Sequence, residues 1–419
     1  MTCLLPICIC YTHNYERYIG KGVDSLNRAT ALLGAGAAIE IGGPTSSELT
    51  KNICSQEETC EALFNQIVGW NNPSHDRQQP NFEDIMNALE SLSSYSNGMR
   101  FKNSEYNPAE LAFIEVKSQK FSEPNSLNLA KSRLINIIAE RVNQYNGQFK
   151  CSDSNTWFWN FWVKATNSCC WDIGTLNYDD CVDQSIHNFN DGYRYTDSEY
   201  STFDPFQMTQ LDNTTRIMHL HGSIFYGYRQ DDKNDNYLEN FFEDLYKFNS
   251  LKKSCDTWNN RSPNISQSGM QAIIGPIITG RRKSDKLLAY PYSYYYNVFQ
   301  QSLLNNSSLL IVGYSFGDLH INSLLWRFKK THGSNRRIVL IADFPKSPCC
   351  WNKDPLKMKW PTPDMYRFIA NFFGQTDPFT SSIFQNPVKS LDGCVMLYVK
   401  GFKDAVENSE NEILNFLTR

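Results

Sequence analysis

Six short apolar runs constrain the fold of this chain more than any other feature. They are rich in leucine and branched residues, and several end in glycine or a polar residue, as buried parallel strands do. Segments with helical periodicity lie between them, and strands that alternate with helices form doubly wound sheets. The sequence therefore predicts an α/β fold with a Rossmann-like, doubly wound parallel sheet. The expected strands are residues 29–36, 171–179, 216–224, 271–280, 307–315 and 336–344.

Long segments interrupt and follow this pattern. Helical periodicity at 60–70, 81–92 and 128–145 predicts a helical lobe inserted at about 61–168, between the first strand and the polar motif after the second. We expect a smaller insertion at about 228–268, within a catalytic domain of residues 1–345. Residues 346–419 are then a C-terminal extension, with a strand-like run at 394–402 and a final amphipathic helix that ends at Arg419.

Composition excludes several classes of function. Lys and Arg number 40 against 44 Asp and Glu, and this balance is unlike that of a dedicated nucleic-acid binder. No window approaches 18 apolar residues, so we expect no membrane-spanning helix. The 13 cysteines are odd in number and irregularly spaced, and the N-terminus does not read as a secretory signal. We therefore expect a cytoplasmic protein without direct contacts to nucleic acid or membrane.

Glycines follow the first expected strand, in the stretch "GAGAAIEIGGP". A strand that ends at Gly34 and Gly36 and opens a helix is typical of a phosphate cradle, because glycine lets the backbone approach an anion. The dinucleotide fingerprint of ordinary dehydrogenases needs a third glycine where this chain has Ile39. On the residues alone, a tight turn without a ligand explains the stretch as well.

Polar side chains follow the next two strands. Thr175, Asn177 and Asp179 alternate, so in an extended chain they face one side and suit recognition of an amide and a ribose. A turn with side-chain caps is the alternative. His221 precedes a glycine and is a candidate general base, while His219 lies two residues earlier.

The fifth and sixth strands also end in polar residues. Gly313 and Ser315 combine close backbone approach with a hydroxyl, which suits a phosphate or ribose contact. We expect Asp318 to stabilise its own loop by local hydrogen bonds. Asp343 ends the last strand, where an acid can bind a ribose.

Four motifs of this chain resemble those of sirtuins, in the same order. "TLNYD" at 175–179 is similar to the family's TQNID, "LHGS" at 220–223 to its catalytic histidine motif, and "GYSFGD" at 313–318 to its GTS loop. The glycine stretch resembles the cofactor loop GAGxSxxxGxP. The positions in register there are Gly34, Ala35, Gly36, Glu40, Gly42 and Pro44.

This resemblance implies that NAD is the substrate. It assigns catalysis to Asn177, which orients water and contacts the nicotinamide ribose, and to the base His221. It implies that Asp179 holds the carboxamide. The other cofactor-binding residues that we expect are Gly34, Ala35, Gly36, Glu40, Pro44, Thr175, Gly313, Ser315 and Asp343, although the family more often has Asn where this chain has Asp343.

The chain also departs from the sirtuin deacylases. They carry a zinc ribbon of two CxxC pairs, and no CxxC occurs here, so we expect no zinc. Ser47 stands where the family has arginine, and Ala38 where it has serine. The chain thus looks like the sirtuin-like NAD hydrolases of bacterial anti-phage systems, most like the subunit that pairs with a HerA-type hexameric ATPase. This implies a homo-oligomer whose NAD depletion aborts infection and whose activity a partner controls.

Other functions remain open at this point. An NAD-dependent deacylase or ADP-ribosyl transferase needs an acyl-peptide or protein acceptor, and a non-catalytic sensor of NAD or ADP-ribose needs neither Asn177 nor His221. An ordinary oxidoreductase fits least, because the third fingerprint glycine is missing. The sequence does not give the oligomer size, the trigger, the partner's identity, the role of the extension or the activity of the isolated chain.

Overall fold

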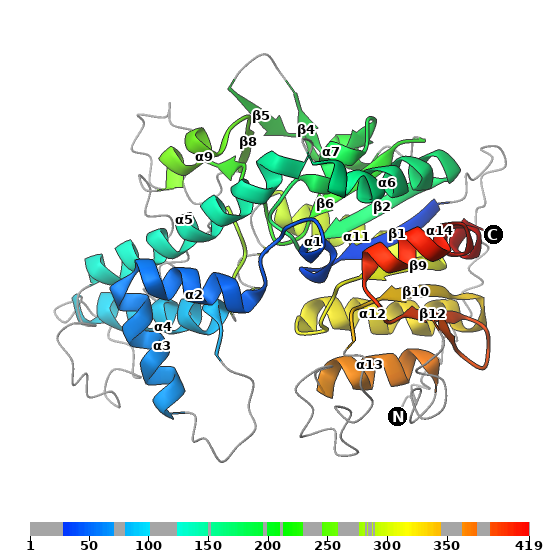
Figure 1. Ribbon diagram of the computed structural model, residues 1–419. Coiled ribbons are helices and arrows are strands. Elements are labelled where there is room, and N and C mark those ends of the chain that lie inside the picture. The colour runs from blue at the N-terminus through cyan, green and yellow to red at the C-terminus, as the bar shows by residue number, and fades with distance from the viewer. Residues whose placement is uncertain are drawn as a thin grey trace, which may run out of the picture.

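A sheet of eight strands, seven of them parallel, forms the centre of the fold (Figure 1). The computed structural model describes residues 28–70, 80–100, 124–149, 152–195, 199–209, 213–228, 245–258, 276–280, 283, 287, 290–344, 363–374 and 386–418.

The six longer parallel strands have the order β6-β2-β1-β9-β10-β12. In chain order this is third, second, first, fourth, fifth and sixth, which is the Rossmann arrangement. The predicted fold class is therefore confirmed. The strands are β1 (Arg28–Leu33), β2 (Cys170–Thr175), β6 (Thr215–His219), β9 (Ser308–Val312), β10 (Arg337–Ile341) and β12 (Val395–Tyr398), with the short β3 (Phe189–Asn190) and β11 (Val388–Lys389) at the edges.

One expected strand is not part of the sheet. Residues 271–275 lie outside the described residues, and the described part of the run, 276–280, forms a single bridge between Ile277 and Gly222. It lies across the loop after β6, since the Ile278 N–H donates to the His221 carbonyl oxygen at 2.7 Å. The apolar run is buried there, which explains why it reads as a strand. The sixth parallel strand is instead β12, from the run at 394–402.

Alternating side chains of the central strands serve two cores, because successive residues of a strand face opposite sides. Leu33 and Leu310 belong to the core on one face, and Leu32 and Leu309 to the core on the other. The first face is covered by α6 (Thr156–Ser168) and α14 (Phe402–Thr418). The second is covered by α11 (Tyr292–Asn305), α12 (Leu319–His332) and α13 (Pro363–Phe373).

Four helices pack together beside the sheet, and we call them the helical lobe (Figure 1). They include the three helices that periodicity predicts. Each of these helices packs against the other three and buries its apolar side there. The lobe helices are α2 (Ser46–Gln56), α3 (Glu58–Trp70), α4 (Phe82–Arg100) and α5 (Pro124–Gln148).

The expected lobe range of 61–168 also contains α6, which packs on the sheet instead. Its aromatic side chains are buried against β2 and α14: Trp162 meets Trp171 with ring centroids 6.0 Å apart. The lobe proper therefore spans 46–148 in the described residues. Of the smaller expected insertion, the described residues 245–258 contain one strand and one helix.

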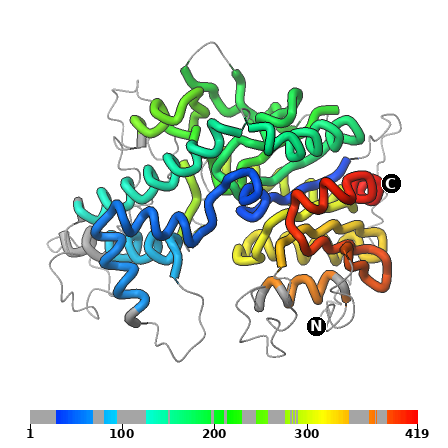
Figure 2. The backbone as a smooth tube through the Cα atoms, in the orientation of Figure 1, coloured from blue at the N-terminus to red at the C-terminus, as the bar shows by residue number. Residues whose placement is uncertain are grey.

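The described parts of the expected C-terminal extension, 363–374 and 386–418, contribute strands and helices to the same sheet and its cores. β12 pairs in parallel with β10, and α14 packs against β1, β9 and β10. The tube in Figure 2 shows this C-terminal helix lying beside the first strand. Phe402, the first residue of α14, packs on α6: its ring contacts the rings of Trp157, Phe158 and Phe161 at centroid distances of 5.2, 5.8 and 5.3 Å.

The remaining elements are short. The loop helix α1 (Gly36–Ile39) follows β1, and a second, four-stranded sheet lies beyond β6. Within the described ranges, no helix is both long and apolar enough to span a membrane. The other elements are η4 (Asp153–Asn155), α7 (Cys181–Ser185), β4 (Tyr193–Arg194), β5 (Tyr200–Phe203), α8 (Pro205–Thr209), β7 (Tyr226–Gly227), β8 (Tyr246–Phe248), α9 (Leu251–Trp258) and η6 (Gly333–Asn335).

Replacing Phe402 tests whether the C-terminal helix belongs to the main core. Phe402→Ala leaves a cavity among three aromatic rings, so we expect the free energy of unfolding in urea to fall by about 3–5 kcal/mol. Leu391→Ala, at a side chain that is 89% exposed, is the control and changes it by less than about 0.5 kcal/mol. Equal effects of the two changes contradict a shared core.

Candidate functional site

A cavity of about 1210 Å³ lies between the carboxyl ends of the strands and the helical lobe. Open α/β sheets bind ligands at this edge, at the point where the connections from the first strand change from one direction along the sheet to the other. Here the reversal falls between β1 and β9. The glycine loop, the loop after β9 and the lobe helices α2 and α4 all line the cavity, so the helical lobe forms its outer wall.

The register of the parallel strands places the predicted motifs at one edge. Leu33 of β1 pairs with Thr175 of β2 and with Val312 of β9. Val312 pairs in turn with Ile341 of β10, and Thr175 with His219 of β6. The residues that follow these five positions therefore form a row along the cavity floor.

The glycine loop and the loop after β9 are in direct backbone contact. The Gly36 N–H donates to the Gly313 carbonyl oxygen at 2.9 Å, and Gly34 N–H donates to the Val312 carbonyl oxygen at 2.9 Å. A Cβ on Gly34 would lie 2.6 Å from that Gly313 oxygen, and a Cβ on Gly36 would lie 2.7 Å from the Gly313 Cα. Gly313 itself has φ +61°, and its Cβ would meet the Ala37 nitrogen at 2.2 Å.

These contacts give the glycines a second purpose. The phosphate-cradle interpretation leaves the first N–H groups of α1 free for an anion, yet the Gly36 N–H is bound to Gly313. The glycines are therefore required by the close approach of two loops. Gly34, Ala35, Gly36, Pro44 and Gly313 line the cavity, and their contacts with a cofactor remain a prediction.

Glu40 lines the cavity but its carboxylate has a partner. Its Oε2 accepts hydrogen bonds from the Phe402 N–H at 2.6 Å and the Lys403 N–H at 2.9 Å. It thus caps the first turn of α14, where unpaired N–H groups and the helix dipole favour a negative charge. We expected Glu40 to bind cofactor, and in this structure it fastens the glycine loop to the C-terminal helix.

Of the three alternating polar residues after β2, Asn177 lines the cavity. Thr175 accepts the Asn177 N–H on its Oγ1 at 3.1 Å, and Asp179 accepts the Cys181 N–H at 3.0 Å. The Tyr145 hydroxyl donates to Asp179 at 2.6 Å. Thr175 and Asp179 are buried and are not among the described residues of the cavity wall.

The chain bends at residues 177–179 and leaves the extended conformation there, which explains why Thr175 and Asp179 do not line the cavity together with Asn177. Alternating positions share a face only while the backbone stays extended. Thr175 and Asp179 thus shape the turn that presents Asn177, in the manner of side-chain caps. Their expected contacts with NAD remain a prediction.

His221 lies on the cavity wall, with a side chain only 3% exposed. Its Nε2 has no hydrogen-bond partner among the described residues. Burial, and then the positive charge of Lys283, lower the pKa of His221 to about 3, although Asp318 acts in the opposite direction. The imidazole is therefore neutral at pH 7, the form of a histidine that acts as a base.

His219 occupies a different environment. It is fully buried, and its Nε2 lies 3.0 Å from an Asp183 carboxylate oxygen, in a network that also contains Lys247 and Asp191. Burial alone lowers the pKa of a histidine, but the Asp183 carboxylate raises the pKa of His219 above its ordinary value. It is not among the described cavity-lining residues.

Ser315 and Asp343 are exposed and line the other end of the cavity, beyond β9 and β10. The backbone of Asp343 bridges to Lys400. Residues that follow strands on both sides of β1 therefore open into one cavity, Asn177 and His221 on the β2 and β6 side and these two residues on the β9 and β10 side.

Sequence reasoning missed an ion-pair cluster on the cavity wall. The Lys283 Nζ lies 2.6 Å from Asp318 Oδ1 and 2.9 Å from Glu83 Oε1, and all three residues line the cavity. Lys283 lies in the basic run "GRRKSDK" at 280–286, and its side chain is only 11% exposed. Pairs so distant in sequence leave no local pattern. Asp318 forms the expected local hydrogen bonds through its backbone, with the Tyr314 hydroxyl, while its carboxylate accepts from Lys283.

Metal ligands are not grouped in the parts of the chain that the structure describes: no three His, Cys, Asp or Glu side chains are arranged to hold an ion. The polar side chains that line the cavity include the amide of Asn177, the neutral imidazole of His221 and the carboxylates of Asp318 and Asp343.

Comparison with known proteins gives one family match. Residues 172–358 match the model of the SIR2-like domain family. The matched range is less than half of the chain; it includes Asn177, His221 and the loop after β9 but not the glycine loop. It supports a sirtuin-like family and an NAD-utilising enzyme of sirtuin type.

Other comparisons add little. No curated protein sequence is significantly similar to this chain. A solved structure described as "Structural Basis for the Mechanism and Regulation of Sir2 Enzymes" is similar at 11% identity, over 83% of this chain and 94% of that chain, with a TM-score of 0.27. Identity and TM-score are too low for an argument about function.

Adding one methyl group at Gly313 tests the contact between the two loops. Gly313→Ala forces a positive φ on alanine and a clash with the Ala37 nitrogen, so we expect a loss of at least about 2 kcal/mol in the free energy of unfolding. Gly147→Ala, in open space near the end of α5, is the control and is neutral or stabilising. A Gly313→Ala protein as stable as the wild type contradicts the contact.

The burial of neutral His221 predicts a pH dependence of stability. Between the folded pKa of about 3 and the unfolded value of about 6.5, the unfolded chain binds the additional proton, so stability falls as the pH falls through this window. One such proton contributes a slope of about 1.4 kcal/mol per pH unit. We expect His221→Asn to show a shallower slope than the wild type in urea titrations over this window. Parallel slopes contradict the assignment.

Proposed function

We propose that this protein is an NAD⁺ hydrolase that converts NAD⁺ to ADP-ribose and nicotinamide. The observation that carries the proposal is the position of Asn177 and His221: both open into one cavity at the carboxyl edge of a Rossmann-type sheet. The match of residues 172–358 to the SIR2-like domain family supports NAD as the substrate. Proton transfer and water control at one end of a dinucleotide-sized cleft are what this reaction needs.

The reaction breaks the bond between the nicotinamide N1 and the ribose C1′. The bonding electrons go to the ring nitrogen, which loses its positive charge, and the transition state resembles an oxocarbenium ion, as in glycoside cleavage. Water then adds its oxygen to C1′ and gives up one proton. In the proposal Asn177 orients this water, and the free Nε2 of His221 accepts the proton, either from water or through a ribose hydroxyl.

The cavity suggests how the dinucleotide lies. The nicotinamide riboside end belongs beside Asn177 and His221, and the adenosine end beside Ser315 and Asp343, whose carboxylate suits a ribose hydroxyl pair. The pyrophosphate then passes over the contact between the glycine loop and the loop after β9. Gly34, Ala35 and Gly36 keep the cavity floor free of large side chains there.

The biological setting is part of the same proposal. By resemblance to the sirtuin-like NAD hydrolases of anti-phage systems, this chain acts in the cytoplasm as a homo-oligomer that depletes NAD⁺ and aborts infection. A partner, for which a HerA-type hexameric ATPase is the proposal, controls its activity. Such control acts naturally through the helical lobe, since the lobe forms the outer wall of the cavity.

Nicotinamide release from NAD⁺ tests the proposal. The full-length protein is assayed without peptide, alone and with a co-encoded ATPase, beside Asn177→Ala and His221→Ala. We expect each change to reduce release by at least about 100-fold, because each removes a group that acts on the reacting water. His187→Ala, at an exposed histidine outside the cavity, is the control and retains activity.

Three results contradict the proposal. Full activity of both variants removes Asn177 and His221 from the chemistry. No release under either condition, while NAD⁺ binds, favours the non-catalytic sensor, and release that requires an acylated peptide favours the deacylase.

A further inference from the structure

We propose that Lys283 is a positioning residue that ties the helical lobe to the loop after β9 and so holds the cavity closed over His221. The inference deepens the proposed function, because it identifies what keeps the lobe in place above the same site. Lys283 lies outside the four motifs that indicate the function. In this proposal it does not contact the substrate.

The geometry of the ion pairs points to this role. Glu83 belongs to the first turn of α4 in the lobe, and Asp318 directly precedes α12, which packs on the sheet. The Lys283 Nζ contacts both carboxylates, at 2.9 and 2.6 Å, and thereby joins α4 of the lobe to the loop that precedes α12. Figure 1 shows these two helices in separate parts of the molecule. Hydrogen bonds that involve charged groups are roughly twice as strong as neutral ones.

Burial strengthens the two ion pairs of Lys283. This residue is 8% exposed, so solvent screens both ion pairs weakly. Burial lowers the pKa of a lysine, but Glu83 and Asp318 together raise the pKa of Lys283 above its ordinary value. The ammonium therefore stays charged at neutral pH. Removing it leaves two acids without their shared cation, and the lobe without this tie.

The charged and titratable groups around His221 come from several elements. Lys283 and Asp318 face it, and the His320 ring of α12 lies 5.8 Å from its ring, centroid to centroid. Glu83 reaches the same cluster from α4 through Lys283. Tyr178, after β2, interacts with Glu83, Lys283 and Asp318 and donates its hydroxyl to the Ile278 carbonyl oxygen at 3.1 Å.

Loss of the tie changes His221 in a defined direction. Burial is the main cause of the low pKa of His221, and the charge of Lys283 is the second. An open lobe admits water, and loss of the ammonium leaves Asp318 as the dominant nearby charge. Both effects raise the pKa of His221 toward its ordinary value of about 6.5.

The test compares four full-length proteins: the wild type, Lys283→Met, Lys283→Arg and Lys389→Met. Lys389 pairs with Glu412 at 2.8 Å on the exposed surface, so its change removes a lysine ion pair away from the cavity. The titration of the His221 ring is followed by NMR with isotope-labelled histidine, and its signal is identified from the spectrum of His221→Asn. KM and kcat for NAD⁺ are measured over the same pH range.

We expect Lys283→Met to raise the His221 titration midpoint by at least about one pH unit. We also expect KM to increase about tenfold, with a smaller change in kcat, because the closed cavity is less populated. Lys283→Arg retains the cation and restores most of both properties, and Lys389→Met behaves like the wild type. If Lys283→Met does not fold, Glu83→Gln replaces it in the test, because it removes only the ion pair on the lobe side. We expect Glu83→Gln to raise KM as well.

The proposal is overturned if Lys283→Met leaves the His221 titration and KM unchanged, or if it increases activity, which would make the lysine a restraint. It is also overturned if Lys389→Met has the same effects. Failure of the proposed function is a separate result: when the wild type releases no nicotinamide, the His221 titration alone decides the role of Lys283.

Discussion

The backbones of two loops touch at Gly34, Gly36 and Gly313, and the rest of the structure depends on that contact. A Cβ at any of these three positions would come within 2.7 Å of the opposite backbone. The contact brings the end of β1 against the end of β9, at the point where the strand order of the sheet reverses. Because the loops are joined there, the cavity floor is continuous from the β6 side to the β10 side, and one ligand can span both.

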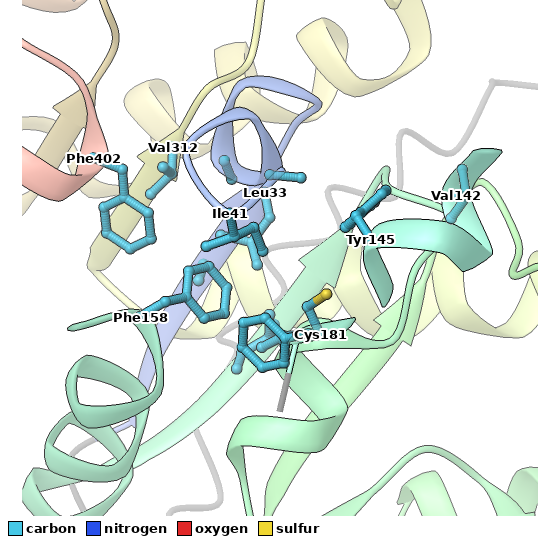
Figure 3. Close-up of a cluster of buried hydrophobic side chains, with 14 of the residues drawn as sticks. Leu33, Ile41, Val142, Tyr145, Phe158, Cys181, Val312 and Phe402 are labelled. Atoms are coloured by element: carbon cyan, nitrogen blue, oxygen red, sulfur yellow. The ribbon is translucent and has the colours of Figure 1, made fainter. Parts of the chain in front are cut away.

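The glycine loop is also supported from two further directions. Glu40 caps the N-terminus of α14. The side chain of Arg141, which belongs to α5 of the lobe, donates to the Gly42 carbonyl oxygen over 3.4 Å. Figure 3 shows the apolar side of this arrangement: Leu33 and Ile41 share one cluster with Val142 and Tyr145 of α5, and with Phe402 of α14. The lobe and the C-terminal helix therefore act on one loop, and a partner that moves either of them changes the shape of the substrate cavity.

Sequence patterns predicted the sheet and the motifs because both depend on local signals. Buried strands are apolar over their whole length, and glycine marks close backbone approach, so the positions around Gly34, Asn177 and His221 were visible before the structure. Long-range contacts were not. Three features depend on residues that lie tens to hundreds of positions apart in the sequence. They are the pairing of β12 with β10, the capping of α14 by Glu40 and the buried ion pairs of Lys283. Thr175 and Asp179 were expected on the cavity wall because alternation was taken to mean an extended chain, and the chain bends there instead.

The destination of the ADP-ribosyl group tests the central claim most directly. The protein, with its partner where one is required, is given NAD⁺ in water labelled with heavy oxygen, and the products are analysed by mass spectrometry. If water is the acceptor at a site formed by Asn177 and His221, every ADP-ribose molecule carries one labelled oxygen, at C1′. ADP-ribose joined to a protein or acyl group, or nicotinamide released only when an acylated peptide is present, would contradict a hydrolase.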